Sequence, residues 1–180
     1  MEIIKTNIEG LDIRINKVVR DKRGFLAEIS PGVKDDPFLK AGIQNMYISV
    51  ATEKHIARGG HFHKKNVENF LTLSGVTLWL FIDCRKESPT FNQFYSIILG
   101  SEKPQIETDV PYYTLDDSKM VQTLIPPGVY HGYWPLTGDS VIVLAIASEP
   151  FKENKEDHFT INLNEYEEVK KHLMKFGISV

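Results

Sequence analysis

The apolar residues of this chain recur in short runs in which they alternate with polar residues. From Leu11 to Asn16 the alternation is strict. Successive side chains of a strand point to opposite faces, so this run predicts a half-buried strand over Leu11–Val19. Further expected strands are Gly24–Ser30, Asn45–Ala51, Glu68–Leu73, Val76–Ile82, Phe91–Leu99, Met120–Ile125 and Ser140–Ala147. Short strands separated by turn residues predict an all-β sandwich or barrel.

Two segments depart from this pattern. Gly100–Lys119 is polar and contains two prolines, so we expect a long excursion between strands, and such loops are usually functional. Near the C-terminus, Asn164 precedes an acidic and then a basic stretch, the order expected for a capped helix. Apolar residues at helical spacing continue to Phe176. A short C-terminal helix over about 164–176 therefore closes the chain.

Composition narrows the compartment and the kind of partner. The chain has 180 residues, which suits one core, so we expect a single domain over residues 1–180. A net charge of −3 argues against nucleic acid, which usually selects a basic surface. The single Cys84 excludes an internal disulfide and fits a reducing compartment. No run approaches the ~18 apolar residues of a membrane span, so we expect a cytoplasmic protein without membrane contact.

Three histidines and a glutamate have a spacing that suits a metal site. His61 and His63 are two residues apart, so a strand presents both on one face. Glu68 rejoins that face if the chain turns at Lys64–Asn66, and a distant strand supplies His131. Three imidazoles and a carboxylate suit a divalent ion such as Zn, Mn, Fe or Ni. The same residues could instead serve as acid, base and anion contacts, or His63 and Glu68 could simply bind each other.

These residues also fit two cupin motifs. His61, His63 and Glu68 follow the HxH…E pattern of the first, and Pro126–His131 supplies the PxGxxH core of the second. Both motifs occur in order, with strands between them. The chain therefore resembles the cupins, and this resemblance implies a jelly-roll double sheet with a pocket at one end.

A closer resemblance is to the dTDP-4-dehydrorhamnose 3,5-epimerase family. It is carried by four stretches: Asp21–Glu28, Arg58–His61, Asp83–Phe91 and Ile125–Tyr133. The DxRxxSPTF run of Asp83–Phe91 is the most specific, because no general requirement of a β-sandwich explains it. The resemblance implies a homodimeric jelly roll, often with strands exchanged between subunits. It also implies action on nucleotide-linked 4-keto-6-deoxy sugars.

The resemblance also implies roles for particular residues. His61 matches the base that removes a proton next to the ketone, and His131 would hold the pocket and the developing anion. Arg23 and Arg58 match positions associated with the nucleotide phosphates and the substrate, where a guanidinium binds oxygens in a bidentate manner. Glu28 matches a residue near the base.

The chain departs from the family at two places. The family's proton donor is a tyrosine on the strand after the second motif, whereas Val141–Ala147 contains none. Tyr133 is the replacement we assign, with Tyr130 and Tyr113 as alternatives. The family carboxylate that pairs with the base has only a loose counterpart, Asn164-Glu165. His158, in a polar stretch, is interpreted as part of a surface loop.

The sequence therefore predicts a nucleotide-sugar isomerase or epimerase of deoxysugar or surface-polysaccharide biosynthesis. It would act on an NDP-4-keto-6-deoxyhexose at C3 or C5, or by 3,4-ketoisomerisation, with no organic cofactor. A ketoisomerase, which moves a proton on one face, tolerates the missing tyrosine better than a double epimerase. Alternatives are a metal-dependent cupin with other chemistry and a sugar-binding cupin without catalysis.

Overall fold

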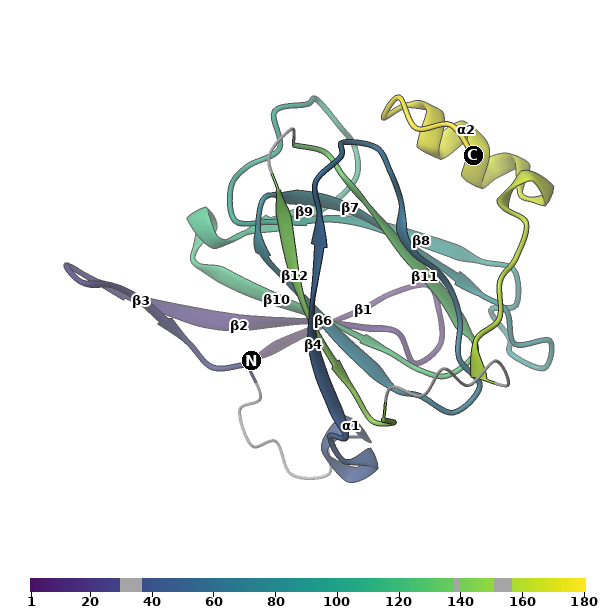
Figure 1. Ribbon diagram of the computed structural model, residues 1–180, viewed down its shortest axis with the longest axis horizontal. Coiled ribbons are helices and arrows are strands. Elements are labelled where there is room, and N and C mark those ends of the chain that lie inside the picture. The colour runs from purple at the N-terminus through teal and green to yellow at the C-terminus, as the bar shows by residue number, and fades with distance from the viewer. Residues whose placement is uncertain (30–36, 138–139, 151–156) are drawn as a thin grey trace.

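The computed structural model describes residues 1–29, 37–137, 140–150 and 157–180, and these form two packed β-sheets (Figure 1). The seven-stranded sheet has the order β1 (Glu2–Lys5), β2 (Asp12–Asp21), β10 (Lys119–Ile125), β6 (Glu68–Ser74), β12 (Val141–Ala147), β4 (Asn45–Ala51), and β3 (Gly24–Ala27) pairs with β2. The five-stranded sheet has the order β5 (Arg58–His61), β11 (Val129–Pro135), β7 (Val76–Asp83), β8 (Phe94–Gly100), β9 (Tyr112–Thr114). Of these neighbours, only β8 and β9 pair in parallel. The expected all-β jelly-roll architecture is confirmed.

Every expected strand is present, with ends shifted by a few residues, and the structure adds four. Ser30, the last residue of one expected strand, lies outside the described residues. Two added strands, β1 and β9, are short, and β9 lies inside the expected polar excursion. The other two, β5 and β11, carry the histidine motifs. Strand β11 is buried along its whole length, so it lacks the alternation that marks a half-buried strand.

The C-terminal helix is shorter than expected. Helix α2 spans Glu167–Met174 and is preceded by a 3₁₀ turn, η3 (Leu163–Glu165). The expected cap, Asn164, instead donates its backbone N–H to the side chain of Asn162, which caps η3. The remaining helical elements are α1 (Pro37–Ala41) and η1 (Leu115–Asp117). None of the helices in the described part of the chain is long and apolar enough to cross a membrane.

The two sheets enclose an aromatic interior. Phe70 of β6 packs against Trp79 of β7, and Trp79 packs against Tyr133 of β11, with ring centroids 5.1 and 4.9 Å apart. A second apolar cluster joins the outer face of the five-stranded sheet to α2, through Val169 and Leu173. These two residues are four positions apart and so share one helix face. Helix α2 therefore covers the outer face of the five-stranded sheet.

The hairpin of β2 and β3 projects beyond the sheets (Figure 1). Three apolar side chains near its tip are exposed: Phe25 at 49%, and the cross-strand pair Val19 and Leu26 at 57% and 65%. Strand β4, at the edge of the seven-stranded sheet, also exposes Met46, Ile48 and Val50. Exposed apolar surface of this extent is uncommon on isolated soluble proteins and marks interaction sites.

Candidate active site and metal centre

The four residues of the metal pattern come together at one end of the interior. His61 is the last residue of β5, Glu68 the first of β6, and His131 lies in the middle of β11, directly opposite His61. The potential donor atoms of these residues and His63 all lie within 4.8 Å of one another. Glu68 and His131 are buried, whereas His61 and His63 are half-buried. The expected convergence of the two cupin motifs is confirmed.

Glycine allows the two strands that carry the histidines to approach closely. Gly59 has a φ of +80°, and a Cβ there would lie 3.1 Å from the carbonyl oxygen of His131. A Cβ at Gly132 would lie 3.2 Å from the backbone nitrogen of Gly60. Only residues without a side chain fit both positions at this separation. The glycines of the RGGH and HG motifs therefore bring His61 against His131.

Backbone carbonyls fix the orientation of two imidazoles. His131 Nδ1 lies 3.2 Å from the carbonyl oxygen of Val129, and His63 Nδ1 contacts the carbonyl oxygen of Asp157. A carbonyl oxygen only accepts hydrogen bonds, so these contacts favour the Nδ1–H tautomer in the neutral form of each ring. The Nε2 lone pairs of both rings are then available to the cluster. Outer contacts of this kind orient histidines that bind metals.

Glu68 lies between these lone pairs. Its Oε2 is 2.9 Å from His131 Nε2 and 3.7 Å from His63 Nε2. His131 Nε2 has no hydrogen-bond partner in the described structure, although its closeness to Glu68 lowers the pKa of that carboxyl. A carboxylate oxygen facing an imidazole lone pair at this separation is repulsive unless a proton or a cation lies between them. The donor set and its geometry therefore fit a divalent ion.

Burial and neighbouring charges set the protonation of the cluster. Burial opposes the charged form of Glu68, but His131, His63 and His61 outweigh it when their rings carry an added proton, and so lower the Glu68 pKa. For His61, burial and then the neighbouring imidazoles lower the pKa to about 3. In the resting site, Glu68 is therefore ionised and His61 is neutral at physiological pH.

A C-terminal segment completes the site, and the sequence analysis did not assign it there. The ring of His158 stacks on His61, with centroids 4.2 Å apart. Asp157 accepts backbone N–H groups of Lys64 and Lys65 through Oδ1, at 2.7 and 3.1 Å. These two hydrogen bonds hold in place the turn that was expected before Glu68. His158 is exposed and lies in a loop, as expected, but the sequence did not indicate that this loop lies against the histidine cluster.

A long-range pairing brings this segment to the cluster. Phe62 and Phe159 form an isolated β-bridge, with N···O distances of 2.8 and 3.0 Å in the two directions. The only signal in the sequence was an acidic residue beside a histidine, which is common in loops. The loose carboxylate candidate Asn164-Glu165 is in η3, and Glu165 accepts a hydrogen bond from Asn162. The carboxylates beside the histidines are instead Glu68 and Asp157.

Tyr133 lies on the same face of β11 as His131. Its hydroxyl is 2.9 Å from Ser49 Oγ, which also accepts the Nε–H of Arg58 at 2.9 Å. Burial raises the Tyr133 pKa, although Ser49 and Arg58 partly oppose it. The alternative Tyr130 points to the opposite face, into the apolar cluster beneath α2. Of the residues singled out from sequence, Tyr133 therefore lies in the interior with the histidines, and the exposed Arg58 contacts its hydroxyl partner, Ser49.

Arg23 and Glu28 are not brought to the cluster within this chain. Arg23 lies in the turn of the projecting hairpin and pairs with Asp21, and Glu28 is exposed just after β3. Clefts of about 330 and 410 Å³ lie elsewhere, between the N-terminal segment, β8 and α2. They contain none of the four clustered residues, so the donor geometry, rather than cleft volume, identifies the site.

Residues 5–168 match the family model of dTDP-4-dehydrorhamnose 3,5-epimerase. No protein with a curated function matches closely enough to be counted.

Solved structures share the fold at low sequence identity. The dTDP-4-dehydrorhamnose 3,5-epimerase of Bacillus anthracis, with TDP and PPi bound, is 23% identical, with a TM-score of 0.69 over 92% of this chain and 86% of that one. The dTDP-6-deoxy-D-glucose-3,5-epimerase of Legionella pneumophila, in complex with dTDP-4-keto-L-rhamnose, is 23% identical, with a TM-score of 0.68 over 89% and 77%. A double mutant of a 3'-monoepimerase from Streptomyces bikiniensis, in complex with dTDP, is 16% identical, with a TM-score of 0.67 over 98% and 77%.

These identities establish the fold alone, whereas the family match spans most of the sequence. The resemblance carried by the four motif stretches is thereby confirmed. The chain belongs to the dTDP-4-dehydrorhamnose 3,5-epimerase family of nucleotide-sugar isomerases.

Proposed function

We propose that this protein isomerises an NDP-4-keto-6-deoxyhexose by removing a proton from a carbon next to the ketone. The products would be the C3 or C5 epimer, or the 3-keto isomer. One observation carries this proposal. His61, the match to the family base, is a half-buried, neutral imidazole beside His131. A neutral imidazole accepts protons, which is the first requirement of this chemistry.

The charge that develops during the reaction would make His61 a stronger base. Its resting pKa of about 3 reflects burial and the nearby imidazoles. Proton removal next to a ketone creates an enolate, and a negative charge close to His61 stabilises its protonated form. His131 borders the position where that anion forms. The site would thus be a weak base at rest and a stronger one as the substrate ionises.

Tyr133 is the proton donor that we propose in place of the missing family tyrosine. Burial raises its pKa, so the phenol keeps its proton at neutral pH. Ser49 and Arg58 hold its hydroxyl from one side. Return of a proton by Tyr133 suits epimerisation, whereas transfer by histidine alone suits 3,4-ketoisomerisation on one face.

We further propose that His61, His63, Glu68 and His131 bind a divalent ion, with Zn, Mn, Fe and Ni as candidates. The fit rests on the two Nε2 lone pairs that face the Glu68 carboxylate. When bound, the ion supplies Lewis acidity for polarising a ketone oxygen. A ligating nitrogen of His61 is not free to accept a proton. The base role of His61 therefore requires the ion-free site, and the two roles make different predictions.

We propose that the functional unit is a homodimer in which the projecting hairpin contacts a second copy. The hairpin and β4 both expose apolar residues, which pairing would bury. Arg58 is exposed at the start of β5, three residues before His61, and is held there by Ser49. Exchange of hairpins would carry Arg23 and Glu28 towards the histidine cluster of the partner, where the arginine could bind the diphosphate. This arrangement explains why neither residue meets the cluster of its own chain.

The Ile48→Glu variant is expected to be monomeric, because Ile48 is 63% exposed on the proposed contact face. Sedimentation velocity at micromolar concentration measures the change. Met174→Glu is the matched control, since Met174 is 68% exposed on α2, away from β4. A dimer that survives Ile48→Glu contradicts this interface.

Incubation in D₂O with a panel of dTDP- and other NDP-4-keto-6-deoxy sugars tests the reaction itself. We expect deuterium at C3, C5 or both in at least one substrate, measured by NMR and mass spectrometry. The position of the label and the product configuration distinguish epimerisation from ketoisomerisation. Metal-free enzyme and enzyme loaded with each candidate ion are compared in parallel. Absence of exchange at C3 and C5 in every combination rejects this reaction class.

A further inference from the structure

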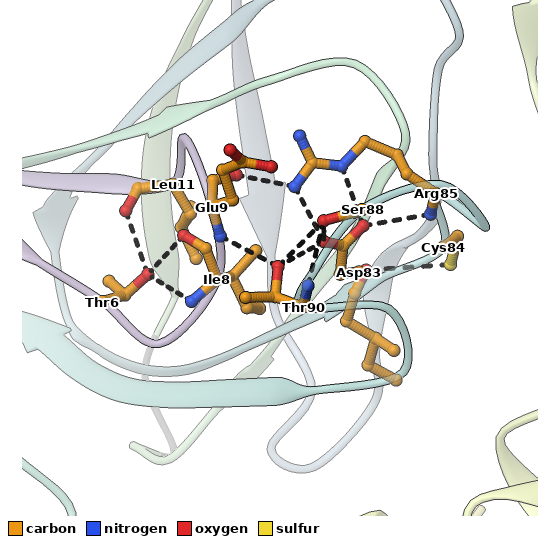
Figure 2. Close-up of polar contacts among 10 residues, drawn as sticks. Thr6, Ile8, Glu9, Leu11, Asp83, Cys84, Arg85, Ser88 and Thr90 are labelled. Carbon is orange, nitrogen blue, oxygen red and sulfur yellow. Dashed lines mark hydrogen bonds and ion pairs between the residues drawn. The ribbon is translucent and has the colours of Figure 1, made fainter.

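The DxRxxSPTF run of Asp83–Phe91 forms a buried polar network at the end of β7 (Figure 2). Asp83 is fully buried. Its carboxylate accepts the backbone N–H of Arg85, two guanidinium N–H groups of Arg85, and the hydroxyls of Ser88 and Thr90, all within 2.6–3.0 Å. Five hydrogen bonds saturate the carboxylate and hold Arg85 in one orientation.

The network also holds the N-terminal loop. Arg85 Nη2 donates to the carbonyl oxygen of Glu9 at 2.6 Å, and Thr90 Oγ1 accepts the backbone N–H of Glu9 at 3.0 Å (Figure 2). Gly10, next in the chain, packs against Pro126, since a Cβ on Gly10 would lie 3.4 Å from Pro126 Cγ. The loop and the network therefore support the turn that begins the second histidine motif.

The same arginine supports that turn directly. A Cβ on Gly128 would lie 2.3 Å from Arg85 Cγ, so the glycine sits against the arginine stem. Gly128 accepts the backbone N–H of Cys84 at 3.0 Å and donates its own N–H to the carbonyl oxygen of His63 at 2.6 Å. His131 is three residues beyond Gly128 in the chain. One turn thus connects the arginine to the backbone of one histidine and to the start of the strand carrying the other.

We propose that Asp83 and Arg85 are positioning residues for the histidine cluster. Asp83 locks Arg85, Arg85 supports Gly128, and Gly128 sets the separation of His63 from the β11 strand. The motif would thereby keep the Nε2 atoms of His63 and His131 directed at the carboxylate of Glu68. The ion-affinity part of this inference rests on the proposed metal site, whereas the orientation of the imidazoles does not. If the network only stabilised the fold, substitutions in it would change neither the ion affinity nor the orientation of the imidazoles.

The Gly128→Ala and Arg85→Ala variants test this inference in the full-length protein. Long-range ¹⁵N–¹H NMR of histidine-labelled, metal-free protein reports which nitrogen of each ring carries the proton. We expect Nδ1–H rings at His63 and His131 in the parent, and loss of that signature at one or both in each variant. Competition with a chromophoric chelator measures Co²⁺ affinity, which we expect to fall at least about 10-fold, as when outer contacts of ligating histidines are removed.

Leu173→Ala is the matched control. Leu173 is fully buried in the cluster between α2 and the outer sheet face, so its truncation lowers the melting temperature without touching the network. It should keep the parent NMR signature and Co²⁺ affinity. If both network variants also keep them while losing as much stability, the positioning role is rejected. If the parent binds no Co²⁺, the metal proposal fails and the NMR signature alone decides the positioning role.

Discussion

Replacing His61 with asparagine is expected to lower deuterium incorporation into the 4-keto sugar by about 100-fold or more. A positioned general base contributes roughly 10²–10⁴-fold to such reactions. Asparagine keeps polarity and much of the volume but cannot accept the substrate proton. The rate is measured by NMR in D₂O at saturating substrate, with enzyme freed of metal by chelation. Parent-like exchange by this variant contradicts the base role.

His63→Ala is the matched variant for that experiment. It leaves the proposed base in place but removes one of the four donors to an ion. If His61 acts as a base in the ion-free site, His63→Ala retains most of the exchange activity. If the ion-bound cluster is the active form, the metal-free parent is inactive, and in ion-loaded preparations both variants lose activity together with their bound ion. Metal analysis of each preparation, purified without metal-affinity steps, separates these outcomes.

The Glu68→Gln variant is expected to bind divalent ions more than about 100-fold more weakly while keeping its fold. The substitution removes the only anionic donor of the cluster and changes little else in shape. A glutamine amide can also donate a hydrogen to His131 Nε2, which has no hydrogen-bond partner in the described structure. We therefore expect the metal-free variant to melt at or above the temperature of the parent. Chelator competition and thermal unfolding measure the two effects.

Glu165→Gln is the control for Glu68→Gln. It makes the same chemical change in η3, where Glu165 contacts Asn162 and not the histidines. Its ion affinity should equal that of the parent. An unchanged affinity in Glu68→Gln would mean that the ion binds elsewhere or that the carboxylate is not a ligand.

The strands could be predicted from local pattern wherever one face is buried and the other is not. β4 has the predicted bounds, Asn45–Ala51, and burial alternates from one residue to the next along it. The equally buried β7 was predicted from its apolar run, whereas His131 and Gly132 interrupt such a run in β11. The pattern also missed the short strand β9. The prediction that Asn164 caps the C-terminal helix was also wrong. Asn164 has a suitable side chain, but a 3₁₀ turn capped by Asn162 precedes the helix.

The four donors of the site could be predicted because two motifs carry them at fixed spacing. Asp157 and His158 could not, since their position depends on the bridge between Phe62 and Phe159, almost a hundred residues apart. Such pairing follows from the packing of the whole fold and leaves no local pattern. The role of Asp83–Phe91 was hidden similarly, because its hydrogen bonds reach a loop near Glu9 and its packing reaches Gly128.

By itself, the sequence determined the β architecture, the family and the set of donor residues, because these depend on side-chain chemistry and short-range periodicity. The tertiary structure decided which nitrogen of each imidazole faces Glu68, which tyrosine shares the interior with His131, and that Arg23 lies away from its own cluster. Those features depend on contacts between segments distant in the chain. Only folding brings such segments together, and burial of apolar surface holds them there.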